Sequence, residues 1–123
     1  MLVRGIRGAT TVTENNADEI VLKTREMIEQ MIHKNGLLPE QVAQVIITVT
    51  HDIDAAFPAR ALRMIDGWSY VPVMCALEIP VPNSLPKCIR VMMTVNTNVT
   101  QEKIEHIYLH GAQVLRPDLQ KNS

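Results

Sequence analysis

The segment 87–95, KCIRVMMTV, constrains the fold most, because the strand that it predicts is apolar on both faces. One face carries Ile89, Val91, Met93 and Val95, and the other carries Cys88, Arg90, Met92 and Thr94. A guanidinium is almost never buried without a partner. We therefore expect Arg90 either to reach water from an edge strand or to lie in a pocket that receives an anion.

Other elements follow from periodicity and from turn residues. Residues 15–36 predict a long helix, with Asn15 or Asn16 as N-cap and Gly36 after its end. Pro58 is expected to open a short helix through Ile65. Strands are expected at 1–12, 42–50, 70–79 and 87–95. Residues 98–111 are ambiguous between helix and strand, 112–118 are expected to be extended, and the last residues to be frayed.

This pattern predicts a single α+β domain over residues 1–123, with 117–123 as a flexible tail. The expected sheet is small and mixed, with two helices. The strands at 42–50 and 88–95 are apolar on both faces, so the sheet needs a cover on each side. Two helices can cover one face, and we expect another subunit to cover the other.

Composition narrows the function classes. Twelve basic and 13 acidic residues nearly cancel, which argues against nucleic acid as the main partner. The N-terminus lacks the pattern of a signal peptide, and no apolar run is long enough to span a membrane. Cys75 and Cys88 lie in apolar runs and are expected to be reduced, buried thiols of a cytoplasmic protein.

Three charged residues interrupt apolar strands: Arg7, Glu78 and Arg90. Glu78 and Arg90 alone could form an ion pair with no functional role. Arg7 adds an uncompensated positive charge, which favours an anionic ligand. Arg60 and Arg63, taken alone, are typical of a solvated helix face. The residues thus indicate a site for a compact carboxylate-bearing molecule.

No motif for a nucleophile, a metal or a dinucleotide accompanies these charges. His106 and His110 have i, i+4 spacing, but no acidic residue or cysteine lies nearby at a metal-ligand interval. We expect them to be a solvent-facing pair. We also expect no cofactor and no metal.

Four stretches, RGIRGATTV, FPARALR…GWSYVPV, CIRVMMTV and IYL…VLRPDL, occur in this order along the chain. Together they resemble the monofunctional chorismate mutases of the Bacillus type. The resemblance implies a homotrimer in which small α+β protomers with a mixed sheet form a pseudo α/β-barrel, with active sites at subunit interfaces. It also implies the Claisen rearrangement of chorismate to prephenate, in the biosynthesis of phenylalanine and tyrosine.

The resemblance assigns roles residue by residue. The catalytic set falls on Arg7, which binds a substrate carboxylate, on Arg90 beside the breaking ether bond, and on Glu78, which binds the hydroxyl. The wider substrate-binding set adds Phe57, Ala59, Arg60, Arg63, Val73, Met74, Cys75, Tyr108, Leu115 and Arg116.

Several of these roles are specific. The neighbouring subunit's wall falls on Phe57, Ala59, Arg60 and Arg63, a backbone contact on Cys75, and the closing C-terminal segment on Leu115 and Arg116. Arg60 stands where the family also uses lysine, which keeps the charge. Met74 stands where a threonine is common, which puts a side-chain hydrogen bond there in question.

Two other function classes fit the same residues. A small trimeric protein with an arginine and a glutamate in an interface pocket could bind or deaminate imino or keto acids. A non-catalytic sensor of a carboxylate metabolite would need the same charges. Product formation from chorismate distinguishes the three.

Overall fold

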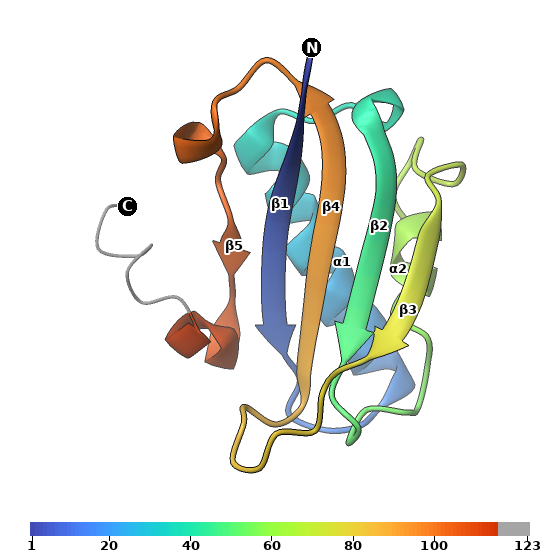
Figure 1. The fold of residues 1–123 in the computed structure, drawn as a ribbon. Coiled ribbons are helices and arrows are strands. Elements are labelled where there is room, and N and C mark those ends of the chain that lie inside the picture. The colour runs from blue at the N-terminus through green and yellow to red at the C-terminus, as the bar shows by residue number, and fades with distance from the viewer. Residues whose placement is uncertain (116–123) are drawn as a thin grey trace.

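The computed structural model describes residues 1–115 of the chain. Five strands form one mixed sheet in the order β3-β2-β4-β1-β5 (Figure 1). The strands are β1 (Leu2–Thr11), β2 (Val42–Val49), β3 (Val73–Leu77), β4 (Cys88–Thr97) and β5 (Ile107–Tyr108). β4 runs antiparallel to β1 and to β2, while β5 is parallel to β1 and β3 is parallel to β2. The sheet is therefore mixed, as predicted.

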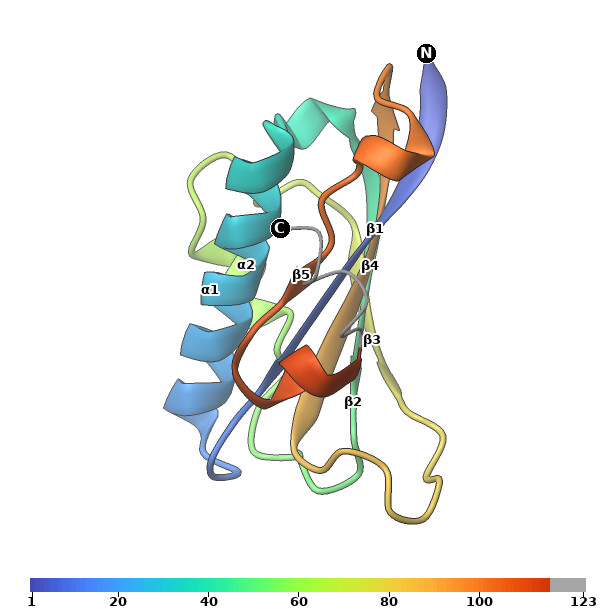
Figure 2. The same cartoon turned by 90° about the vertical axis from the view of Figure 1, so that its left-hand side faces the viewer.

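One face of the sheet is covered by helices α1 (Ala17–Asn35) and α2 (Arg60–Arg63) (Figure 2). α1 begins where the Asn16 side chain accepts a hydrogen bond from the Glu19 amide, and it ends at Gly36 in the left-handed conformation. Its buried side chains are Ile20, Val21, Thr24, Met27, Ile28 and Met31. This confirms the predicted long helix and its two caps.

Gly8 lies where β1 approaches α1 closely. A Cβ at this position would lie 2.6 Å from the sulfur of Met31 and 3.2 Å from Cγ of Met27. Both methionines are fully buried. The glycine therefore lets the helix settle onto the strand, and this contact helps to fix the backbone that carries Arg7.

The alternation predicted for segment 87–95 is present in β4. Ile89, Val91, Met93 and Val95 are buried under the helices, whereas Arg90 and Met92 are exposed on the opposite face. β4 is the middle strand of the sheet, so of the two alternatives for Arg90 the edge strand is excluded, and Arg90 lines a cavity instead. Arg90 reaches solvent because no helix of residues 1–115 lies over this face, which we call the open face (Figure 2).

The C-terminal part differs from the sequence-based prediction. Residues 112–118 were expected to be extended, but His110–Leu115 form a 3₁₀ helix, η3. Its Gly111 amide donates to Oγ1 of Thr11 at 3.0 Å, and the Ala112 amide donates to the Leu109 carbonyl. Ala112 is fully buried as a result. Contact with β1 thus outweighs the local preference for an extended chain.

Other elements also differ from their predicted ranges. The ambiguous stretch 98–111 contains a 3₁₀ turn at Gln101–Lys103 and the short strand β5. The third strand spans only Val73–Leu77, and the short helix only Arg60–Arg63; a further 3₁₀ turn, Pro39–Gln41, precedes β2. The predicted tail, 117–123, lies outside the described residues.

Candidate active site

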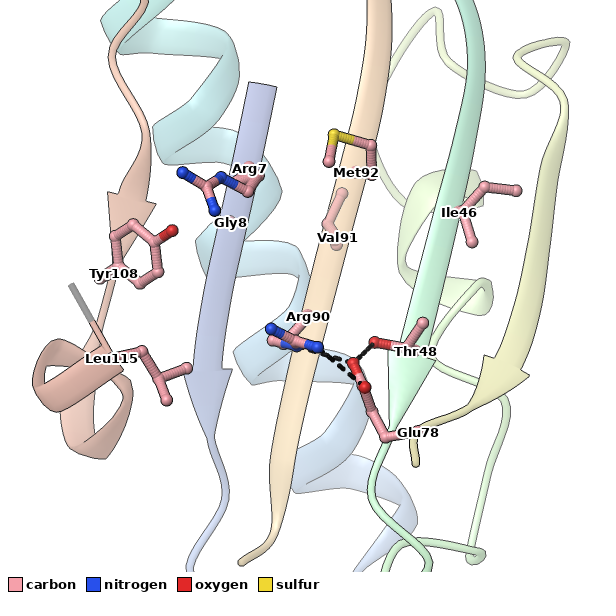
Figure 3. Close-up of a pocket in the computed structure, with 10 residues that line it drawn as sticks. All are labelled: Arg7, Gly8, Ile46, Thr48, Glu78, Arg90, Val91, Met92, Tyr108 and Leu115. Carbon is pink, nitrogen blue, oxygen red and sulfur yellow. Dashed lines mark hydrogen bonds and ion pairs between the residues drawn. The ribbon is translucent and has the colours of Figure 1, made fainter. Parts of the chain in front are cut away.

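A cavity of about 390 Å³ lies on the open face of the sheet. Five of the predicted site residues line it: Arg7, Glu78, Arg90, Tyr108 and Leu115 (Figure 3). They come from four parts of the chain: β1, the residue after β3, β4, and the segment from β5 to η3. The fold therefore brings the predicted catalytic set, Arg7, Glu78 and Arg90, into one cavity.

The register of the strands explains this convergence. Arg90 of β4 lies opposite Thr48 of β2 on one side and opposite Ala9 of β1 on the other. Tyr108 of β5 follows in the same row, because it pairs with Ala9. Residues paired across strands point to the same face. Arg90 and Tyr108 thus flank a small side chain, and Arg7 lies two residues before Ala9 on the same strand.

Glu78 and Arg90 form a bidentate ion pair. Nε of Arg90 donates to Oε2 of Glu78 at 2.7 Å, and Nη2 donates to Oε1 at 2.8 Å. The Glu78 side chain is 18% exposed and that of Arg90 52% exposed. The Arg90 hydrogen bonds lower the pKa of Glu78 despite its partial burial, and the same bonds raise the pKa of Arg90. Both groups are charged at neutral pH.

Arg7 supplies a second positive charge. Among the ion pairs within residues 1–115, none includes Arg7. Its backbone amide donates to Nδ1 of His106 at 2.9 Å, which ties β1 to the chain just before β5. Two guanidinium groups and one carboxylate therefore line the cavity. This excess of positive charge favours a ligand that carries at least one carboxylate.

Other predicted residues are not brought to this cavity. Phe57 and Cys75 line a separate hollow of about 480 Å³ beside β3, at the other edge of the sheet from β5. Ala59, Arg60, Arg63, Val73 and Met74 do not line the Arg90 cavity either. Arg116 lies outside the described residues. Within one chain, β2, β4 and β1 separate the β3 edge from the Tyr108 edge.

Five lining residues were absent from the predicted site: Gly8, Ile46, Thr48, Val91 and Met92. Thr48 could have been found, because it is the hydroxyl residue on the same strand face as Ile46 in an apolar run.

The prediction for His106 was wrong. It is half-buried and accepts a hydrogen bond through Nδ1, whereas His110 is exposed and bonds Glu26. Burial lowers the pKa of His106.

The cysteines offer little nucleophilic chemistry. Burial raises the pKa of Cys88 to about 11, so its thiol is protonated at neutral pH. Cys75 is half-buried and also free.

In the part of the chain that the structure describes, no three His, Cys, Asp or Glu side chains group as metal ligands would. No described helix has the length and apolar character that crossing a membrane requires.

Fold and site together define a class: a small α+β protein whose sheet presents a doubly cationic cavity with one carboxylate. Comparisons with known proteins specify it further. Residues 3–119 match the family described as chorismate mutase type I. Because this match covers nearly the whole chain, the protein belongs to the chorismate mutase type I family.

Individual relatives agree with this assignment. "Chorismate mutase AroH" of Bacillus subtilis (strain 168) is 51% identical over 119 residues, covering 97% of this chain and 94% of the relative. "Chorismate mutase AroH" of Thermus thermophilus is 48% identical over 120 residues, covering 97% and 98%. The solved structure "Chorismate mutase from Clostridium thermocellum Cth-682" superposes with a TM-score of 0.87 at 53% identity, covering 90% of this chain and 98% of that one.

Proposed function

We propose that this chain is a chorismate mutase that converts chorismate to prephenate, on the route to phenylalanine and tyrosine. The observation that carries this function is the cavity itself, which combines Arg7, Arg90 and Glu78. A Claisen rearrangement is pericyclic and needs no nucleophile, no metal and no proton transfer. The relatives named above support the same activity.

Arg7 and Glu78 bind the substrate in its ground state. Chorismate carries two carboxylates, a ring hydroxyl and an ether oxygen. Arg7 binds one carboxylate through its guanidinium, as a planar fork matches a carboxylate in geometry. Glu78 accepts a hydrogen bond from the ring hydroxyl. A cavity that fixes both ends selects the compact, pseudo-diaxial conformer in which the reacting carbons approach.

Arg90 acts on the transition state. The C–O bond breaks ahead of C–C bond formation, so negative charge develops on the ether oxygen. A guanidinium held near that oxygen interacts more strongly with the transition state than with the substrate, which lowers the barrier. Arg90 suits this role because it stands on the middle strand of the sheet and is held by two bonds to Glu78. The pair is thus oriented before the substrate arrives.

The assembly follows from the same cavity. We propose a homotrimer in which the Phe57 side of one subunit closes the Arg90 cavity of the next. Phe57 is 73% exposed and Met74 70% exposed, although both are large and apolar. Phe57 and Cys75 lie beside β3, away from the Arg90 cavity of their own chain. Contact between copies would cover the open face and complete each site with Ala59, Arg60, Arg63 and Val73.

The function is tested by incubating the purified protein with chorismate and separating the products by liquid chromatography. Conversion to prephenate well above the protein-free rate is expected. Tight binding of chorismate without conversion would instead indicate a sensor. Ammonia release from a 2-imino acid, with no effect on chorismate, would indicate the deaminase alternative.

A further inference from the structure

Thr48 occupies a position between the two charged groups of the site. It lies opposite Arg90 on β4 and opposite Ala76 on β3, two residues before Glu78. Its side chain is on the open face and lines the cavity (Figure 3). The three strands therefore present Glu78, Thr48 and Arg90 next to one another.

The hydrogen bonds give Thr48 a specific effect on Glu78. Oγ1 of Thr48 donates to Oε2 of Glu78 at 2.5 Å, and the same oxygen accepts from Nε of Arg90 at 2.7 Å. Oε1 accepts from Nη2 of Arg90. A carboxylate has about four acceptor positions, so these bonds use three of them. The remaining position is on Oε1, and it is available for a substrate hydroxyl.

We propose that Thr48 is a positioning residue, whose hydroxyl fixes the rotation of the Glu78 carboxylate and, through it, the direction of the Arg90 guanidinium. This inference rests on the proposed function. Glu78 directly follows β3. Its backbone amide donates to the Val49 carbonyl at 2.9 Å, so its backbone is anchored to β2. The Glu78 side chain still has rotatable bonds. Arg90 holds it from β4, and Thr48 adds a contact from β2.

Removing the hydroxyl changes two properties of the site. Glu78 loses one of the hydrogen bonds that favour its charged form, so its pKa rises. Arg90 is then paired with a carboxylate that lacks its side-chain contact to β2. The other titratable groups that face Glu78 are Arg90 and Cys88 on β4, Arg7 on β1, Tyr108 on β5, and His51 and Asp52 in the loop after β2. They remain in place, so the change can be attributed to residue 48.

The test compares three variants of the full-length protein. Thr48→Val keeps the branched shape without the hydroxyl, Thr48→Ser keeps the hydroxyl, and Thr94→Val makes the same chemical change on the open face away from the cavity. The rate of chorismate conversion is measured across pH, with folding checked by circular dichroism. A second readout, the ¹³C NMR titration of the Glu78 carboxyl, does not depend on activity.

Thr48→Val is expected to lower kcat by roughly tenfold or more, the size of a hydrogen bond to a charged group. The acid limb of kcat/KM and the Glu78 titration should both move to higher pH. Thr48→Ser should restore all three values, and Thr94→Val should leave them unchanged. A merely structural role would lower stability without moving the Glu78 titration.

Two results would overturn the inference: an unchanged Glu78 titration and kcat in Thr48→Val, or a loss in Thr48→Ser as large as in Thr48→Val. The NMR titration keeps the two proposals distinguishable. A shift of the Glu78 titration in a protein that does not convert chorismate would refute the proposed function but retain the contact between Thr48 and Glu78.

Discussion

Arg90 provides the sharpest test of how the cavity works. Replacement by glutamine removes the positive charge and keeps a planar hydrogen-bonding group. Replacement by lysine keeps the charge and removes the planar fork. A guanidinium has five N–H donors, of which Glu78 uses two, on Nε and Nη2. Three donors therefore remain for the substrate, and Arg90→Gln removes the charge and leaves only the two N–H donors of an amide in place of five.

The expected loss is set by the interaction made only in the transition state. Removing one donor from an oxyanion site costs roughly 10²–10³ in kcat, or about 2.7–4 kcal/mol. Arg90→Gln should lose at least this much, because Arg90 offers a full charge as well as several donors. Arg90→Lys should recover only part of the loss, since an ammonium cannot hold Glu78 in a bidentate pair and reach the ether oxygen as well.

The assay is steady-state conversion of chorismate, with kcat and KM separated and folding checked by circular dichroism. Arg63→Ala is the comparison, because Arg63 lies on α2 away from the cavity of its own chain. Arg63→Ala should act mostly through KM if Arg63 attracts the chorismate dianion at the rim of the cavity. If Arg90→Gln raises KM but leaves kcat unchanged, Arg90 serves binding only and the proposed role in the transition state is refuted.

Three further predictions concern assembly, pH and packing. Sedimentation equilibrium should give a homotrimer, and a monomer that stays fully active on dilution would contradict the shared site. The folded-state pKa of Glu78 is lowered, so its pairing with Arg90 stabilises the fold at pH values above the unfolded carboxyl pKa, and this stabilisation is lost as pH falls through the folded pKa. Chemical denaturation at a series of acidic pH values should therefore show a weaker pH dependence of stability in Glu78→Gln than in the unaltered protein. An equal dependence would argue against the pair. Gly8→Ala should lower the free energy of unfolding by about 1–3 kcal/mol, because its Cβ would meet buried Met31; unchanged urea unfolding would show that α1 moves aside freely.

Local patterns were sufficient for the helix and for the chemistry of β4. The cap residues and apolar spacing of 15–36 act within one segment, and the structure confirms α1 with Asn16 and Gly36 at its ends. The period of two in 87–95 correctly assigned Arg90 to the face opposite Ile89 and Val91. Charges in apolar strands also predicted that Arg7, Glu78 and Arg90 belong to one site, because uncompensated arginines have few structural uses, and the fold brings the three to one cavity.

Long-range register lay beyond such patterns. Thr48 matters because β2 pairs with β4 so that Thr48 meets Arg90, and nothing within 42–50 specifies this partner. His106 accepts a hydrogen bond from the Arg7 amide, 99 residues away in sequence, only because β5 pairs with β1. The 3₁₀ helix at His110–Leu115 likewise depends on Thr11. These features depend on strand order, which a single sequence does not specify.

The most direct measurement follows chorismate by proton NMR in D₂O with the purified protein present. The rearrangement only breaks a C–O bond and forms a C–C bond, so every carbon-bound hydrogen is retained. Prephenate should appear as the sole product, without deuterium at its ring carbons, and much faster than in the protein-free sample. Release of pyruvate, deuterium at a ring carbon of the product, or no acceleration at all would contradict a pericyclic reaction in the Arg90 cavity.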